Sequence, residues 1–152
     1  MRYTLEDSID IHRSAADVYA VISDVTRTGE WSQQCHTVEW VGPERGVGAR
    51  FAGHNRTPTR EWTTTSQVTV ADPGSRFEWT VGTSGTTWGY RLEPIDDATT
   101  RLTEYTAFTG AGEEFFSERF GDDADNQIQI RLTAAATGIG PTLAQIKRIV
   151  EA

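Results

Sequence analysis

The fold is decided by residues 9–19, which read Ile9-Asp10-Ile11-His12-Arg13-Ser14-Ala15-Ala16-Asp17-Val18-Tyr19. Apolar and polar residues alternate up to Ile11, and this period of two predicts a strand over residues 3–12. Ser14 followed three residues later by Asp17 is the pattern of a capping box, which predicts that a helix begins there. A second short helical turn is expected to end at Gly29. The chain is therefore predicted to begin with a strand and two short helices.

The middle of the chain predicts a run of strands joined by short turns. Apolar alternation places these strands near residues 38–40, from residue 51 onward, and over 62–70, 77–81, 88–92 and 102–108. Turn-forming sequences such as Asp72-Pro73-Gly74 separate them. Connections of hairpin length exclude parallel pairing for most of these strands, so the sheet is expected to be antiparallel.

After residue 108 the hydrophobic period changes to three or four, which predicts one long amphipathic helix. Its apolar positions are Ile128, Leu132, Ala135, Ile139, Leu143, Ile146 and Val150. Gly138, Gly140 and Pro141 lie inside this pattern. Since proline lacks a backbone donor and clashes with the preceding turn, the helix is expected either to kink or to split into two there.

The order of these elements indicates the α+β class. We expect one curved antiparallel sheet of about seven strands that wraps around the long C-terminal helix. The sequence contains no internal repeat, linker or low-complexity segment, so a single domain over residues 1–152 is expected.

The composition excludes several classes of partner. The chain of 152 residues carries 14 Lys and Arg against 22 Asp and Glu, and this acidity argues against nucleic-acid or anionic-membrane surfaces. No apolar stretch is long enough for a membrane-spanning helix, and the acidic start is unlike a signal peptide. The single cysteine, Cys35, suits a reducing cytoplasm. A cytoplasmic monomer or homodimer is expected.

Four segments together resemble the START-like superfamily, also called helix-grip, SRPBCC or Bet v 1-like, in its polyketide cyclase/dehydrase branch. They are residues 9–19, the stretch from Asp24 to Trp31, the glycine loop and strand at 46–51, and the last-strand signature at 99–104. The resemblance implies a cavity between the sheet and the C-terminal helix for a hydrophobic or amphipathic small molecule. Members of the superfamily share no single catalytic constellation, so the resemblance assigns no catalytic residue.

Aromatic residues are the first candidates for the wall of such a cavity. The candidates are Trp62, Trp88 and Tyr90, which lie on strands whose successive side chains face opposite sides. Planar ligands would stack on these rings, and their indole or phenol groups would form hydrogen bonds. Phe108 and, on the helix, Ile139 are expected to complete the wall. The alternative for each ring is that it only fills the core.

Glu104 is the candidate acid–base group. It shares a strand face with Leu102, Thr106 and Phe108, so burial would raise its pKa into a useful range. The alternative is a structural ion pair between Glu104 and Arg91 or Arg101.

A basic stretch lies between residues 45 and 60, with four arginines, His54 and no acid. Arg56 or Arg60 would bind an anionic group of a ligand through two hydrogen bonds, and His54 and Asn55 are further polar candidates. In a cyclase, Arg60 would stabilise an enolate. The alternative is an exposed basic surface.

The segment 113–125 holds six acids together with Phe115, Phe116 and Phe120. It is interpreted as a lid over the cavity, with Phe116 pointing inward, or as the solvated start of the long helix. No metal or nucleotide cofactor is expected, because the three histidines and Cys35 form no metal-ligand pattern and no phosphate-binding loop is present.

Three hypotheses follow. The first is a protein that binds a hydrophobic or aromatic small molecule, lipid- or polyketide-like, in a central cavity. The second is a polyketide cyclase or aromatase that uses Glu104, Arg60 and Tyr90. The third is an interaction module whose acidic segment 113–125 contacts a basic partner.

Overall fold

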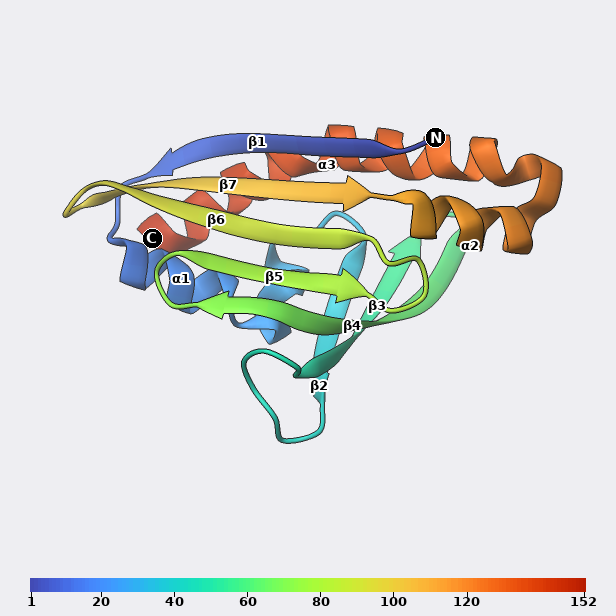
Figure 1. Cartoon of the computed structure of the whole chain (residues 1–152). Helices are drawn as coiled ribbons and strands as arrows, with labels where there is room; N and C mark the ends of the chain where they lie inside the picture. Colours follow the sequence, from blue (N-terminus) through green and yellow to red (C-terminus); the bar gives the residue numbers. More distant parts are fainter.

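A seven-stranded antiparallel sheet forms the frame of the molecule in the computed structural model, which describes residues 1–152. The strands are β1 (Tyr3–Ile11), β2 (Cys35–Val41), β3 (Arg50–Thr57), β4 (Arg60–Asp72), β5 (Arg76–Val81), β6 (Thr87–Asp96) and β7 (Thr99–Phe108). Their order across the sheet is β1-β7-β6-β5-β4-β3-β2, so the first strand pairs with the last (Figure 1). The predicted antiparallel α+β fold is confirmed.

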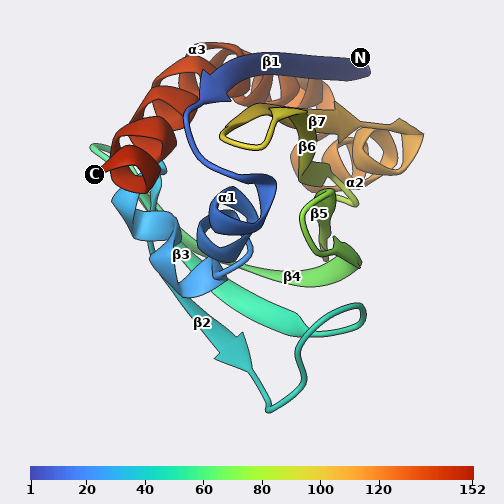
Figure 2. The ribbon, with the colours of Figure 1, turned by 90° about the vertical axis from the view of Figure 1, so that its left-hand side faces the viewer.

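Two short helices follow β1, as the sequence predicts: α1 (Ala15–Ile22) and the 3-10 helix η1 (Val25–Glu30). The side chain of Ser14 caps α1, because its hydroxyl accepts a hydrogen bond from the backbone N–H of Asp17 at 3.2 Å. Asp24 caps η1 in the same way through the N–H of Thr26. Figure 2 shows the sheet curving so that α1 lies within its concave side.

The C-terminal helix α3 (Ala124–Glu151) is continuous over 28 residues and includes Pro141. The alternative of two helices split at Gly138–Pro141 is therefore wrong. Before α3 the structure has a separate helix, α2 (Gly110–Phe120), and a short 3-10 turn, η2 (Gly121–Asp123). The sequence indicated a lid or a helix start in this region, and the structure shows a distinct helix that packs against α3.

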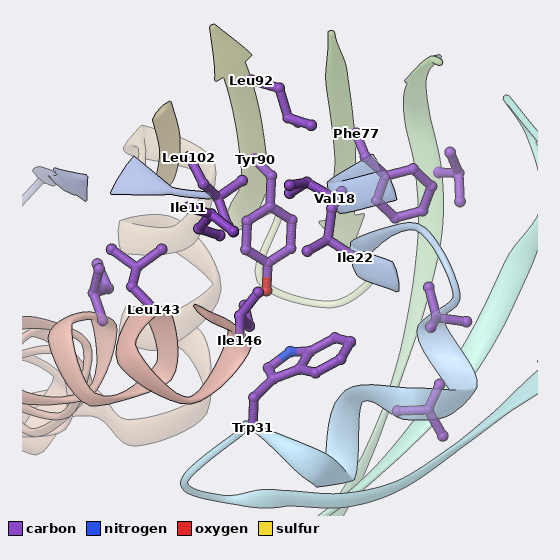
Figure 3. Packing of buried hydrophobic residues seen from close by; sticks show 14 of the residues in the cluster. Ile11, Val18, Ile22, Trp31, Phe77, Tyr90, Leu92, Leu102, Leu143 and Ile146 are labelled. Atoms are coloured by element: carbon purple, nitrogen blue, oxygen red, sulfur yellow. The ribbon is translucent and has the colours of Figure 1, made fainter. Parts of the chain in front are cut away.

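The buried residues form two clusters. The larger one joins β1, α1, the sheet and the second half of α3, with Ile11, Leu102 and Ile146 fully buried (Figure 3). The smaller one lies where α2 meets β7 and α3, and consists of Phe108, Phe116, Ala124 and Ile128. The large cluster fixes α3 against the sheet at one end, and the small cluster fixes α2 at the other.

Candidate functional site

A cavity of about 560 Å³ lies between the sheet and α3, and both hydrophobic clusters contribute to its wall. Residues of the curved sheet line one side, and η1, α2 and α3 contribute to the other. This volume is within the usual range for small-molecule sites. The structure therefore contains the cavity that the helix-grip resemblance implies.

Aromatic rings form much of this wall. Trp62, Trp88 and Tyr90 line the cavity, in agreement with their expected orientation, and Trp79 joins them from β5. Trp79 is paired across the sheet with Trp88, and its ring centroid lies 5.9 Å from that of Tyr90. Phe108, Phe116 and Ile139 also line the cavity. The arrangement gives a planar apolar ligand several faces on which to stack.

Glu104 is a buried carboxyl group in this apolar wall, with only 5% of its surface exposed. Burial raises its pKa to about 8, while the nearby Tyr90 hydroxyl acts in the opposite direction through a hydrogen bond. Glu104 and Tyr90 are directly opposite each other on β7 and β6. The pair therefore places a carboxyl group that is mostly protonated at neutral pH beside a phenol.

The structural alternative for Glu104, an ion pair with arginine, is excluded. Arg91 bonds Glu6 at 2.5 Å, and Arg101 bonds Asp10 at 2.9 Å. Both arginines alternate with inward-facing residues on their strands and so lie on the opposite face of the sheet. Glu104 takes part in none of the ion pairs of the structure.

Tyr90 carries its hydroxyl into the large apolar cluster and is 3% exposed. Its hydroxyl points toward the indole of Trp31 (Figure 3), which favours the ionised phenol, but burial and the neighbouring Glu104 raise its pKa well above the ordinary value. Trp31 follows η1 and is 3% exposed, and its carbonyl accepts a hydrogen bond from the hydroxyl of Thr142 on α3. This contact joins η1 to α3 across the cavity wall.

Of the three residues of the basic stretch that are site candidates, one lines the cavity and two do not. Arg60 lines the cavity at the start of β4, with its guanidinium 4.3 Å from the centroid of the Trp62 ring. His54 instead contacts Glu39 and Thr63, and Arg56 lies outside the cavity. On β3 the inward positions are Gly53 and Asn55, so His54 and Arg56 lie on the outer face by strand alternation. Their expected place in the cavity wall is therefore wrong.

Many residues that line the cavity were not selected from the sequence, among them Trp79, Arg119 and Arg131, and Asn55 was named only as a further polar candidate beside His54. Trp79 had a readable signal, because it shares one face of its strand with the apolar Phe77 and Val81. Asn55 also had a readable signal, since it lies four residues after the apolar Phe51 and therefore on the same face of the strand. Arg131 lies within the helical stripe between Ile128 and Ala135, while Arg119 had no comparable signal.

The segment 113–125 contributes aromatic side chains to the cavity and acids to other contacts. Phe115, Phe116 and Phe120 line the cavity, and Phe116 is 5% exposed. Glu113 bonds the N-terminal amino group and, at 2.7 Å, Arg2. Helix α2 thus covers one end of the cavity, as the lid interpretation expects.

Two further features concern other kinds of site. No three His, Cys, Asp or Glu side chains gather into a group suited to holding a metal ion. None of the helices has the length and apolar character that crossing a membrane would require.

The fold and the cavity define a class: helix-grip proteins that bind a small hydrophobic molecule between a curved sheet and a C-terminal helix. The chain belongs to the polyketide cyclase / dehydrase and lipid transport family, whose model matches residues 2–139. No curated protein matches it.

Among solved structures, the chain is similar to the Polyketide_cyc-like protein Cgl2372 from Corynebacterium glutamicum, with 45% identity and a TM-score of 0.70 over 99% of this chain and 93% of that one. The Zhui aromatase/cyclase from Streptomyces sp. R1128 is 18% identical, with a TM-score of 0.73 over 100% and 98% of the two chains. The di-domain aromatase/cyclase StfQ from the steffimycin biosynthetic pathway is 14% identical, with a TM-score of 0.74 over 99% and 51%. The last two similarities concern the fold alone.

Proposed function

We propose that this protein binds a lipid- or polyketide-like small molecule, apolar and partly aromatic, in the cavity between the sheet and α3. The observation that carries the proposal is the cavity of about 560 Å³, with its aromatic wall and one buried polar pair, Tyr90 and Glu104. Family membership supports it, since the family description names polyketide cyclases and lipid transport. We further propose a cytoplasmic monomer or homodimer.

Affinity would come from burial of apolar surface against Trp62, Trp79 and Trp88. Orientation would come from Glu104 and Tyr90. Because the pKa of Glu104 is about 8, its carboxyl group is mostly protonated at pH 7 and donates a hydrogen bond. A ligand carbonyl or hydroxyl oxygen placed beside the pair is the natural acceptor.

The experiment is a titration with N-phenyl-1-naphthylamine, a neutral aromatic dye that fluoresces in apolar surroundings. Four of the five tryptophans line the cavity. We expect saturable one-to-one binding with energy transfer from tryptophan to the dye, and a one-to-one complex in native mass spectrometry. Dye fluorescence that rises without saturation, or without energy transfer, would contradict binding in the cavity.

A second candidate function is polyketide cyclisation. The structural observation that favours it is the buried carboxyl group of Glu104. A carboxyl group with a pKa of about 8 exchanges its proton near neutral pH, as a general base requires. As the carboxylate, Glu104 would take a proton from a carbon between two carbonyls of a poly-β-ketone chain. That carbon would then attack a ketone of the same chain, whose oxygen would receive a proton from Tyr90, and Glu104 would pass the proton it took to the Tyr90 phenolate through the hydrogen bond between them.

For this second function we expect Glu104→Gln to lower the cyclisation rate of a linear poly-β-ketoacyl thioester by about 10²–10⁴-fold, the usual contribution of a positioned acid–base group. Affinity for the neutral dye should stay within tenfold, about 1.4 kcal/mol. Product formation is followed by absorbance and mass, with the uncatalysed reaction as the reference. Equal rates for the variant and the unaltered protein would exclude Glu104 as the base and leave the binding function standing.

A further inference from the structure

Three arginines from three different elements line the end of the cavity that α2 covers. Arg60 is the first residue of β4, Arg119 lies in the last turn of α2, and Arg131 lies on α3. Burial lowers the pKa of Arg131, and the nearby positive charges of Arg60 and Arg119 lower it further. We call Arg60, Arg119 and Arg131 the arginine cluster.

None of the three has an acidic partner, although acids outnumber basic residues in this chain by 22 to 14. The arginines and the lysine that do form ion pairs are Arg2, Arg27, Arg76, Arg91, Arg101 and Lys147. Like charges that approach one another without a counter-ion repel, and the repulsion is strongest where solvent is partly excluded, as at the half-buried Arg131. An anion bound among the three would relieve it.

Each guanidinium group of the arginine cluster lies over the face of an aromatic ring. Arg60 lies 4.3 Å from the centroid of Trp62, Arg119 lies 5.5 Å from that of Phe120, and Arg131 lies 5.1 Å from that of Phe116. A guanidinium stacked on a ring keeps its N–H donors in the plane, where they are available to an oxyanion. Arg131 uses one nitrogen to donate to Gln127, and no other side-chain hydrogen bond occupies the cluster.

We propose that the arginine cluster binds the anionic head group of an amphipathic ligand, a carboxylate or phosphate, whose apolar body occupies the cavity. This proposal rests on the proposed function and specifies its ligand class. The rings beneath the arginines, Trp62, Phe116 and Phe120, themselves line the cavity, so the charged and apolar surfaces are continuous. A free inorganic anion would use only the first of these surfaces.

A matched pair of dyes tests the charge directly. 8-Anilino-1-naphthalenesulfonate has the ring system of N-phenyl-1-naphthylamine with one added sulfonate. We expect the sulfonate dye to bind at least tenfold more tightly than the neutral dye, with a preference that decreases as salt is added. Equal affinities would overturn the cluster while leaving the cavity function intact. Absence of binding by both dyes would instead contradict the proposed function.

Single substitutions test which arginines cause the preference for the sulfonate dye over the neutral dye. Arg119→Gln and Arg131→Gln should each reduce the ratio of the two affinities by at least threefold, whereas Arg131→Lys, which keeps the charge, should retain part of it. Arg45→Gln is the matched control, because Arg45 also stacks on an indole, 4.4 Å from Trp40, but outside the cavity. Thermal melts confirm that each variant is folded. A ratio unchanged in Arg119→Gln and Arg131→Gln would overturn the assignment.

Displacement of the neutral dye identifies the head group. We expect laurate and dodecyl phosphate to displace it at concentrations at least tenfold lower than dodecanol, with the two anions below their critical micelle concentrations and dodecanol below its solubility limit. Inorganic phosphate at the same concentrations should not displace the sulfonate dye. Displacement by inorganic phosphate as strong as by dodecyl phosphate would overturn the proposal of an amphipathic ligand in favour of a small-anion site.

Discussion

Replacing Glu104 by glutamine should stabilise the protein by an amount that increases as the pH rises from about 4.5 to about 8. Glu104 is 5% exposed and has no cationic partner, so its ionised form is costly in the folded state. Glutamine has nearly the same shape, carries no charge, and still offers an oxygen to the Tyr90 hydroxyl. The variant removes the cost of ionisation and little else.

The sign of this pH dependence follows from how many protons the folded and the unfolded protein bind. Burial raises the folded-state pKa to about 8 from the ordinary 4.5, so between these values the folded protein binds more protons than the unfolded chain. Stability due to Glu104 is thus fully present below pH 4.5 and is lost as the pH rises through 8. Each pKa unit corresponds to about 1.4 kcal/mol, so the loss reaches roughly 3–5 kcal/mol.

The measurement is the free energy of unfolding by urea at pH 4.5, 6, 7 and 8.5, for the unaltered protein and for Glu104→Gln. Other ionisable groups are common to both proteins and cancel in the difference. Glu61→Gln, at an exposed position on β4, is the control and should give a difference independent of pH. A similarly constant difference for Glu104→Gln would show that Glu104 is ionised in the folded protein without cost.

Much of the fold could be predicted from the sequence because it depends on local rules. The strand that ends at Ile11, the cap at Ser14 and the apolar stripe of α3 each appear as a period or a spacing within a few residues. Helix α2 was not separated from α3, because aromatic and acidic residues are mixed in 113–125 without a clear helical period. Its position is fixed instead by Phe116, which packs against Phe108 at a centroid distance of 5.4 Å.

The cavity wall could be predicted only where strand alternation was applied consistently. The side chains of Glu104 and Tyr90 were expected to point into the cavity because apolar residues two positions away on the same strands share their face. The same rule applied from Phe51 selects Asn55 rather than His54, and the basic character of the stretch led to the wrong choice. The approach of Arg60 to Arg131 has no local signal, since it depends on how the start of β4 and the helices meet in space.

Replacing Thr64 by tryptophan should reduce binding of N-phenyl-1-naphthylamine by at least tenfold, about 1.4 kcal/mol. Thr64 lines the cavity from β4, opposite Gly53 on β3, so a larger side chain there extends into the space that the ligand occupies. Adding Ala135→Trp on α3, whose side chain lines the opposite wall, should abolish binding altogether. Binding is measured by energy transfer from tryptophan and, independently of the added indoles, by native mass spectrometry.

Thr65→Trp is the matched control, because Thr65 is the next residue on the same strand and its side chain is exposed on the outer face. Both substitutions introduce the same side chain into β4, so any general effect of tryptophan on the strand is common to them. We expect dye affinity within twofold for Thr65→Trp. Equal losses for the two variants would show that binding depends on the integrity of β4 rather than on the cavity.

Stability separates an open cavity from a packed core at Thr64. A large residue forced into a close-packed core costs about 1–3 kcal/mol, because neighbouring side chains must leave their preferred rotamers. In an open cavity the same indole instead buries apolar surface without displacing its neighbours, so the free energy of unfolding should be unchanged or higher. Loss of binding with retained stability is the combination that only a ligand cavity predicts. Loss of both would indicate that the space around Thr64 is too closely packed to accept a ligand.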